Sequence, residues 1–317
     1  MIALVAGGIH CSKPASAPTP QPAPAKPASP EPPPRPVRDA ARIAKLKQLR
    51  KTLTPLHERA GEPQSGDWLA EHEEDGETFE EYLASEPTVV RPERDRLYIQ
   101  PIGPFSKSER RILTLTADFM ARYFDLPVDV LPDLPLSVIP ERAQREHPEW
   151  GTHQLLAPYI LDKVLKPRLP KDAAALLGLT AVDLYPEPSW NFVFGEASLR
   201  DRVGVWSLHR HGDPDESAAS FRLALRRTLA TATHETGHMF GMAHCTLWDC
   251  NMAGSNSLEE SDRGTLALCP ECLPKLLWAT GGDAQRHLRR LAEFSHAQGL
   301  REEATFYRRQ LEALKSE

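Results

Sequence analysis

The string HETGHMFGMAH, which begins at His234 and ends at His244, combines the residue types and spacing of a catalytic metal centre. His234 and His238 are four positions apart, so on a helix both imidazoles project from one face toward one ion. Glu235 is rotated by about 100° from His234, and its carboxylate can reach a water at the ion without becoming a ligand. Gly241 can turn the chain, which would bring His244 back as the third ligand.

Three protein ligands leave a fourth position open, as a catalytic zinc site requires and a structural one does not. Zinc would lower the pKa of its water, and Glu235 would act as the general base that makes this water a nucleophile. A bare HExxH occurs by chance in many proteins, but Gly241 and His244 extend it at metzincin spacing. The motif therefore predicts a zinc peptidase that hydrolyses peptide bonds.

Four of the five cysteines follow this motif closely, at Cys245, Cys250, Cys269 and Cys272. Two pairs separated by a loop suit a tetrahedral Cys₄ zinc site. Disulfides are the weaker alternative, because Cys269 and Cys272 form a CxxC and no clear secretory signal is present. We expect a structural zinc here, and so two zinc ions per chain. Because Cys245 adjoins His244, loss of this zinc should loosen the catalytic site.

Other residues near the motif allow simpler interpretations. Met252, in a CxM context, is a candidate for the methionine that packs beneath a metzincin metal, although it could be an ordinary core residue. The histidines that lack metal-binding partners are read as surface residues: His209, His211, His287 and His296.

The strands and helices that must position these residues follow an α/β (α+β) pattern. Strands are expected at 96–103, 127–132, 173–185, 191–197 and 202–210, and helices at 38–53, 106–124, 152–164, 217–242 and 283–315, with short helical pieces around DWLAEH and FEEYLA. Ser106 and Glu109 fit a capping box, and the apolar stretch 173–185 suits a central strand covered on both faces. The expected parts are a tail (1–40), an N-terminal extension (41–95), a catalytic domain (96–282) and a C-terminal helix (283–317).

The tail is rich in proline: residues 12–37 hold 11 of the 30 prolines, which predicts an extended, disordered segment. Cys11 before it resembles a processed lipoprotein cysteine, but His10 does not fit that signal. A soluble cytoplasmic protein is the favoured expectation, and a lipoprotein of the cell envelope is the alternative. The net charge of −6 without a Lys/Arg block argues against nucleic acid as a partner, and no apolar run is long enough for a transmembrane helix.

HETGHMFGMAHC, CNMAGSNSLEESDR and LCPECLPKL together resemble the archaemetzincin family, and SGDWLAEH and RLYIQPIGPF resemble its longer, animal-type members. The likeness spans roughly residues 66–282. It implies a metzincin-like fold with a twisted mixed sheet, an active-site helix and a Met-turn at Met252. It also implies the two ligand sets given above. By the same resemblance, RVGVWSLHR would be the edge strand that pairs with an extended peptide substrate, through Val203, Gly204, Val205 and Trp206.

The resemblance leaves the substrate open, and small or unfolded peptides are expected. Aminopeptidase activity is associated with some members, and a free amine would need a carboxylate near the cleft, for which the candidates are Glu196, Asp201, Glu259 and Glu260. A zinc-stabilised binding protein without activity is the runner-up, although such a protein has no need of Glu235. A third reading is an interaction protein with the C-terminal helix as its docking surface.

Overall fold

The computed structural model describes residues 39–198 and 200–315. Asp39–Glu317 forms one compact unit. Cys11 and the proline-rich stretch lie outside the described residues, and the expected boundaries at 95/96 and 282/283 stay predictions. None of the helices within the described ranges is long and apolar enough to cross a membrane.

A mixed five-stranded sheet forms the centre of this unit, in the order β2-β1-β5-β8-β7. Three neighbouring pairs are parallel, and β7 alone runs antiparallel to its neighbour β8. The strands are β1 (Arg96–Ile102), β2 (Val128–Val130), β5 (Ala173–Thr180), β7 (Gly195–Ala197) and β8 (Val203–Ser207). All eight residues of β5 are buried, as its continuous apolar sequence predicts for a central strand covered on both faces.

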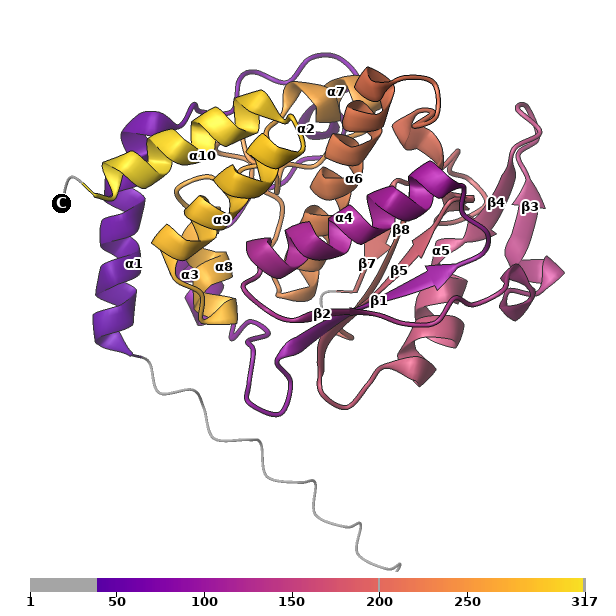
Figure 1. The fold of residues 1–317 in the computed structure, drawn as a ribbon, viewed down its shortest axis with the longest axis horizontal. Coiled ribbons are helices and arrows are strands. Elements are labelled where there is room, and N and C mark those ends of the chain that lie inside the picture. Colours follow the sequence, from indigo (N-terminus) through magenta and orange to yellow (C-terminus); the bar gives the residue numbers. More distant parts are fainter. Residues whose placement is uncertain (1–38, 199, 316–317) are drawn as a thin grey trace, which may run out of the picture. The chain divides into compact units, whose positions relative to one another are not determined.

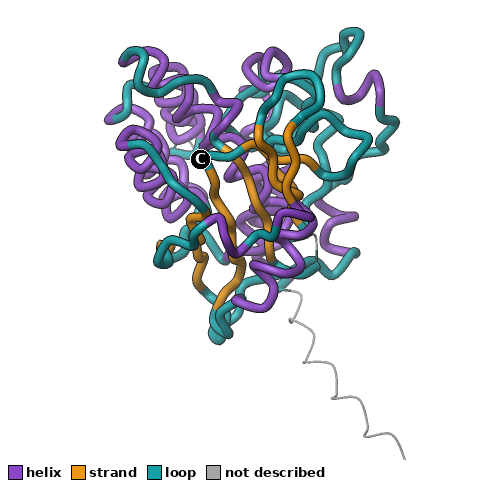
Figure 2. The backbone as a smooth tube through the Cα atoms, turned by 90° about the vertical axis from the view of Figure 1, so that its right-hand side faces the viewer, coloured by secondary structure: helices purple, strands orange, loops and turns teal. Residues whose placement is uncertain are grey.

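Helices cover both faces of the sheet (Figures 1 and 2). One face carries α4 (Lys107–Tyr123) and α6 (Ala218–Met239), and the other carries the short α5 (Ala157–Tyr159) with a π-helical segment, Ile160–Leu165. Ser106 and Glu109 form the expected capping box of α4. The helix expected at 152–164 is wrong in its first part, because His153–Leu156 forms strand β4 and helical structure starts only at Ala157.

A second, three-stranded sheet has the order β3-β4-β6. It consists of β3 (Gln144–Glu146), β4 and β6 (Asp183–Tyr185). The single strand expected at 173–185 is therefore two strands that belong to different sheets. Short 3₁₀ segments connect these parts, at Thr54–Leu56, Leu136–Val138, Glu141–Ala143, Lys166–Arg168 and His209–His211.

Both ends of the described chain pack onto the same side of the molecule as α4 and α6. At the N-terminal end lie α1 (Ala40–Leu53), α2 (Trp68–Glu71) and α3 (Phe79–Ala84), and at the C-terminal end lie α7 (Leu258–Arg263), α8 (Cys272–Thr280), α9 (Ala284–Ala297) and α10 (Arg301–Ala313). α1 packs on α8 and α10, α3 packs on α8, and α9 packs on α4. Figure 1 shows α9 and α10 side by side near the C-terminus.

The single C-terminal helix expected at 283–315 is wrong. The chain reverses between α9 and α10 at Gly299, whose φ of +75° is a left-handed conformation that glycine adopts without strain. Leu288, Leu291 and Phe294 of α9 are buried in the main core. These side chains therefore cap the core rather than form a free docking surface.

Candidate active site

The long helix α6 carries the first two histidines of the motif. The Ser217 side chain caps its first turn by accepting a hydrogen bond from the Ser220 N–H. The helix ends at Met239, and Gly241 follows with φ +81°, which confirms the expected turn. The buried Tyr82 hydroxyl of α3 donates to the Phe240 carbonyl 2.8 Å away and so holds the end of this helix.

The structure brings His234, His238 and His244 together. One ligand atom from each lies within 4.8 Å of the others, a grouping that could hold a metal ion. The Nε2 atoms of His234 and His238 are 3.0 Å apart. The three rings are mutually tilted, with centroids 4.6 to 5.3 Å from one another.

Each of the three imidazoles is oriented through its Nδ1 atom. His234 Nδ1 donates to the Asn251 carbonyl and His238 Nδ1 donates to the Met242 carbonyl, both over 2.8 Å. His244 Nδ1 bonds both carboxylate oxygens of Glu74, at 3.0 and 2.9 Å. With all three Nδ1 atoms engaged by oxygen, the Nε2 atoms are the ones left to bind an ion.

The protonation state of the helical histidines suits ligation. Burial, followed by the neighbouring imidazoles, lowers the pKa of His234 well below its ordinary value. Burial likewise lowers the pKa of His238 to about 4. Both rings are therefore neutral at pH 7, and the neutral imidazole is the form that binds metals.

Met252 packs against the helix that carries His234 and His238. It is buried, and a Cβ atom added at Gly237 would come within 2.5 Å of the Met252 sulfur. Gly237 stands between the two histidines of α6, so the absence of a side chain there lets the methionine approach the helix backbone. The Met-turn role of Met252 stays a prediction.

Glu235 projects beneath the edge strand β7. A Cβ atom at Gly195 would lie 2.8 Å from the Glu235 carboxylate, so glycine is needed at that position of the strand. Burial, and secondarily the charge of Glu196, raises the pKa of Glu235 to about 8. A cation held by the histidines would act in the opposite direction and favour the ionised carboxylate.

A cavity of about 1100 Å³ opens onto these side chains. Its walls come from residues 60–69 of the N-terminal extension, the 186–197 loop with β7, α6, and the segment 248–265. Trp68 and Trp190 come from two different segments of this wall, and their rings lie 4.0 and 6.5 Å, centroid to centroid, from the same side chain, His72. The cavity is large enough for several residues of a peptide.

The four clustered cysteines also come together. All are buried and free, and their sulfur atoms lie within 4.8 Å of one another, so they could hold a second ion. No disulfide joins them, and the Cys245 and Cys269 sulfurs are 3.7 Å apart. The backbone N–H of Cys245 donates to the Met252 carbonyl over 2.8 Å, which ties this cluster to the segment that packs against Gly237.

The prediction that Val203, Gly204, Val205 and Trp206 form the substrate-binding edge is wrong. These residues belong to β8, which is paired on one side with β5 and on the other with β7. All are buried, and both edges of their backbone are already hydrogen-bonded. In the described part of the chain, the edge strand beside the site is β7.

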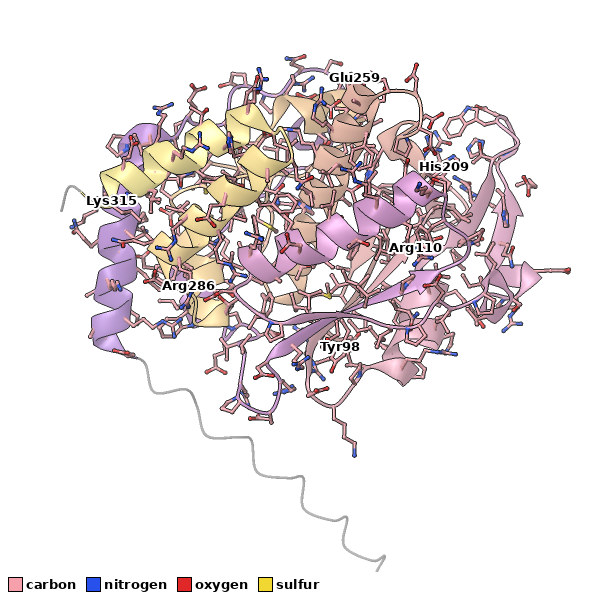
Figure 3. All side chains as sticks on the ribbon, viewed as in Figure 1. Tyr98, Arg110, His209, Glu259, Arg286 and Lys315 are labelled. Carbon is pink, nitrogen blue, oxygen red and sulfur yellow. The ribbon has the colours of Figure 1, made fainter. Side chains whose placement is uncertain are left out.

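Two of the four histidines read as surface residues are in the core. His211 hydrogen-bonds Thr228 at 2.9 Å, and His287 donates to the Tyr123 carbonyl over 2.8 Å. Burial lowers their pKa values to about 3 and about 4, so both are neutral. His209 and His296 are exposed as expected, and Figure 3 shows His209 at the surface near α4.

The four carboxylates considered for binding a substrate amine differ in their position relative to the cavity and in their partners. Glu196 lines the cavity, whereas Asp201 lies outside it in an ion pair with Lys166. Glu260 lines it too, but its carboxylate already accepts hydrogen bonds from the Trp68 and Asn256 amides. Glu259 is exposed and lies at the surface over α7 (Figure 3).

Two contributors to the site were missed by reading the sequence. Glu74 lies among several acidic residues that give no sign of its partner, and it meets His244 only through the fold. Gly195 lies against Glu235 in the strand expected at 191–197, whereas the substrate edge was expected at 202–210. The glycine itself was the available signal, because an isolated glycine in a strand marks a close approach of another group.

Comparison with known proteins agrees with the motifs. The sequence model of Peptidase family M54 matches residues 141–277. Archaemetzincin-2 of Macaca fascicularis is 38% identical over 68% of this chain and 68% of its own length, and archaemetzincin of Pyrococcus furiosus is 32% identical over 58% and 93%. The crystal structure of archaemetzincin from Methanopyrus kandleri is 31% identical and covers 63% of this chain and 98% of that one, with a TM-score of 0.47. By sequence, the chain belongs to the archaemetzincin family of zinc metallopeptidases.

Proposed function

We propose that the chain hydrolyses peptide bonds with His234, His238 and His244 as the ligands of a catalytic zinc ion and Glu235 as the general base. One observation carries this proposal: every Nδ1 atom of the three grouped histidines is held by an oxygen, which leaves their Nε2 atoms to bind one ion. Glu235 is adjacent to this cluster but is not one of its members, so its carboxylate is left to act as the base.

The chain's own groups divide the chemistry between them. When bound, zinc supplies a Lewis acid that polarises the scissile carbonyl and makes water easier to deprotonate. Glu235 accepts a proton from that water, and the oxygen adds to the carbonyl carbon. Glu235 then gives the proton to the leaving nitrogen as the C–N bond breaks, so the carboxylate ends the cycle as it began.

The edge strand β7 supports an extended peptide as the substrate. The backbones of Ser198 and Phe194 hydrogen-bond to β8, so the alternating register turns the N–H and C=O groups of Gly195 and Ala197 outward. A peptide added there would gain main-chain hydrogen bonds without a strict sequence requirement. Small or unfolded peptides can adopt this extended conformation directly, because a folded substrate would first have to release a strand.

Metal removal tests the proposed function. A peptide library incubated with the wild-type protein should be cleaved, cleavage should stop after treatment with a zinc chelator, and added zinc should restore it. Cleavage that survives complete loss of metal would contradict the proposal. A protein that retains zinc and cleaves no member of the library is the binding protein considered above.

We also propose that Cys245, Cys250, Cys269 and Cys272 hold a second, structural zinc ion. Four buried thiols without a disulfide would be poorly satisfied on their own, whereas they supply a closed tetrahedral set for zinc. Analysis of the purified protein should then give two zinc ions per chain.

An aminopeptidase activity is supported by Glu196. One of its carboxylate oxygens is buried without a hydrogen-bond partner among the described residues, and Glu196 is among the residues that line the cavity. Burial, followed by the charge of Asp162, raises the pKa of Glu196 to about 7. A substrate ammonium group would supply the missing partner.

Replacing Glu196 with glutamine should remove this preference. The ratio of kcat/KM for a free peptide to that for its N-acetylated form should fall by about 10- to 100-fold, the value of a hydrogen bond to a charged group. In the wild type, KM for the free peptide should fall as the pH rises through about 7, because Glu196 becomes ionised. Glu187→Gln is the control, since Glu187 also lines the cavity but already accepts a bond from Ser189. Equal cleavage of free and acetylated peptides by the wild type would exclude the role.

A further inference from the structure

The N-terminal extension is attached directly to the loop that carries the third histidine. The Ala60 N–H donates to the Leu247 carbonyl over 3.2 Å, and the Asp249 N–H donates to the Glu58 carbonyl over 3.1 Å. Farther along, a Cβ atom at Gly76 would collide with Thr246 at 2.3 Å. Residues 58–76, called the docking segment below, therefore follow residues 244–263 closely.

Trp68 fixes the middle of the docking segment against the same loop. Its backbone N–H donates to the Glu260 carboxylate over 2.9 Å, and a Cβ atom at Gly254 would come within 2.5 Å of its indole ring. The ring meets His244 edge to face, with centroids 5.1 Å apart and an interplanar angle of 79°. Arg263 pairs with Asp67 next to it, at 2.5 Å. The segment is thus held in register on both sides of Trp68.

This attachment brings Glu74 to His244. Its two carboxylate oxygens lie 3.0 and 2.9 Å from Nδ1 of the imidazole. The other two imidazoles are oriented by backbone carbonyls that follow α6, Asn251 and Met242. His244 is the exception, because its orienting oxygen comes from a side chain 170 positions earlier in the sequence.

We propose that Glu74 is the positioning residue for the third metal ligand, so that the docking segment is part of the metal centre and not an appendage. This inference rests on the proposed role of His244 as a zinc ligand. The M54 match at residues 141–277 does not include Glu74. The docking segment supplies both this carboxylate and, through residues 60–69, a wall of the cavity.

The physical reason is the effect of a carboxylate on a ligating imidazole. It fixes the Nδ1–H tautomer, holds the ring plane, and increases the electron density at the nitrogen that binds the ion. Loss of such a partner typically lowers metal affinity by about 10- to 100-fold. An ordinary exposed Glu–His pair would instead contribute almost nothing measurable. The side chains of Glu74 and His244 are only 30% and 18% exposed, so this pair is partly shielded from water, unlike an ordinary surface pair.

The experiment compares Glu74→Gln and Glu74→Ala with the wild type and with Glu73→Gln as the matched control. Glu73 is the adjacent glutamate and is exposed. Each protein is loaded with Co²⁺ and titrated with a chelator while its absorption is followed. Thiolate-to-cobalt charge-transfer absorption reports the cysteine cluster, so cobalt that leaves without changing this absorption comes from the histidine cluster.

We expect the histidine-bound cobalt of Glu74→Ala to be released at a chelator concentration about 10- to 100-fold lower than in the wild type. Glu74→Gln, which can still accept the hydrogen bond but carries no charge, should lie between the two. The cysteine-bound cobalt should be unchanged in all of them, and Glu73→Gln should match the wild type.

Two outcomes overturn the inference in distinguishable ways. If wild type and Glu74 variants release the histidine-bound cobalt together, Glu74 has no positioning role, although the proposed peptidase function stands. If the wild type binds no cobalt outside the cysteine cluster, the proposed function itself fails. Loss of cobalt from both clusters in Glu74→Ala alone would mean unfolding, in which case Glu74→Gln decides.

Discussion

Replacement of Glu235 by glutamine is expected to lower kcat for peptide hydrolysis by about 10²- to 10⁴-fold, the usual contribution of a general base. Glutamine fills the same space beneath Gly195 but cannot accept a proton from water. Zinc content should stay at the wild-type value, because Glu235 does not belong to either cluster of candidate ligands. Steady-state kinetics and metal analysis on the same preparation check both statements.

The stability of the metal-free variant gives a second measure. The pKa of Glu235 is raised to about 8, so without metal this side chain is mostly protonated at pH 7 and resembles a neutral glutamine. The Tm of metal-free Glu235→Gln should therefore be close to that of the metal-free wild type. Glu259→Gln, at an exposed position of α7, is the control for kinetics. Unchanged kcat would remove Glu235 from the mechanism, and loss of zinc with activity would make it a metal-holding residue.

The metal centre was predictable where its geometry is local. His234 and His238 share a helical face because they are four residues apart, and Gly241 turns the chain as expected. The spacing of the cysteines similarly indicated one cluster, which the four adjacent thiols form. In each case a few residues of covalent structure determine the distance between the side chains.

The orientation of the site was not predictable in the same way. Glu74 meets His244 through the packing of the docking segment, and no short-range pattern encodes a contact across 170 residues. The edge strand was misassigned for a related reason. Both 191–197 and 202–210 have strand-like sequences, and only the order of the sheet shows that β7 lies outside β8.

Two other errors have particular physical causes. His211 and His287 were read as exposed because they lack metal-binding partners in the sequence, but each has a hydrogen-bond partner in the core that compensates for burial. The break between α9 and α10 was missed because apolar residues continue at helical spacing on both sides of it. Gly299 was the signal, since glycine after a helical stretch commonly ends the helix.

Replacement of Cys272 by serine is expected to lower the Tm by about 10 °C, as loss of a structural metal belongs to the most destabilising class of changes. Cys272 is fully buried at the first turn of α8, a helix that packs on α1 and α3. Serine fits the space but is a poor zinc ligand. Loss of this ion would therefore free both α8 and the N-terminal helices from the loop that follows α6.

The histidine site should weaken in the same variant, although no histidine is touched. Cys245 directly follows His244, and its backbone N–H donates to the carbonyl of Met252, whose side chain packs against Gly237 between the two helical histidines. We expect the zinc content to fall from two ions to fewer than one per chain, with loss of peptidase activity, while Cys11→Ser matches the wild type. Calorimetry and metal analysis check these results. A Cys272→Ser protein that keeps both its Tm and its zinc would show that the cysteines are not a metal site, whereas loss of one ion with full activity would show that the two clusters are independent.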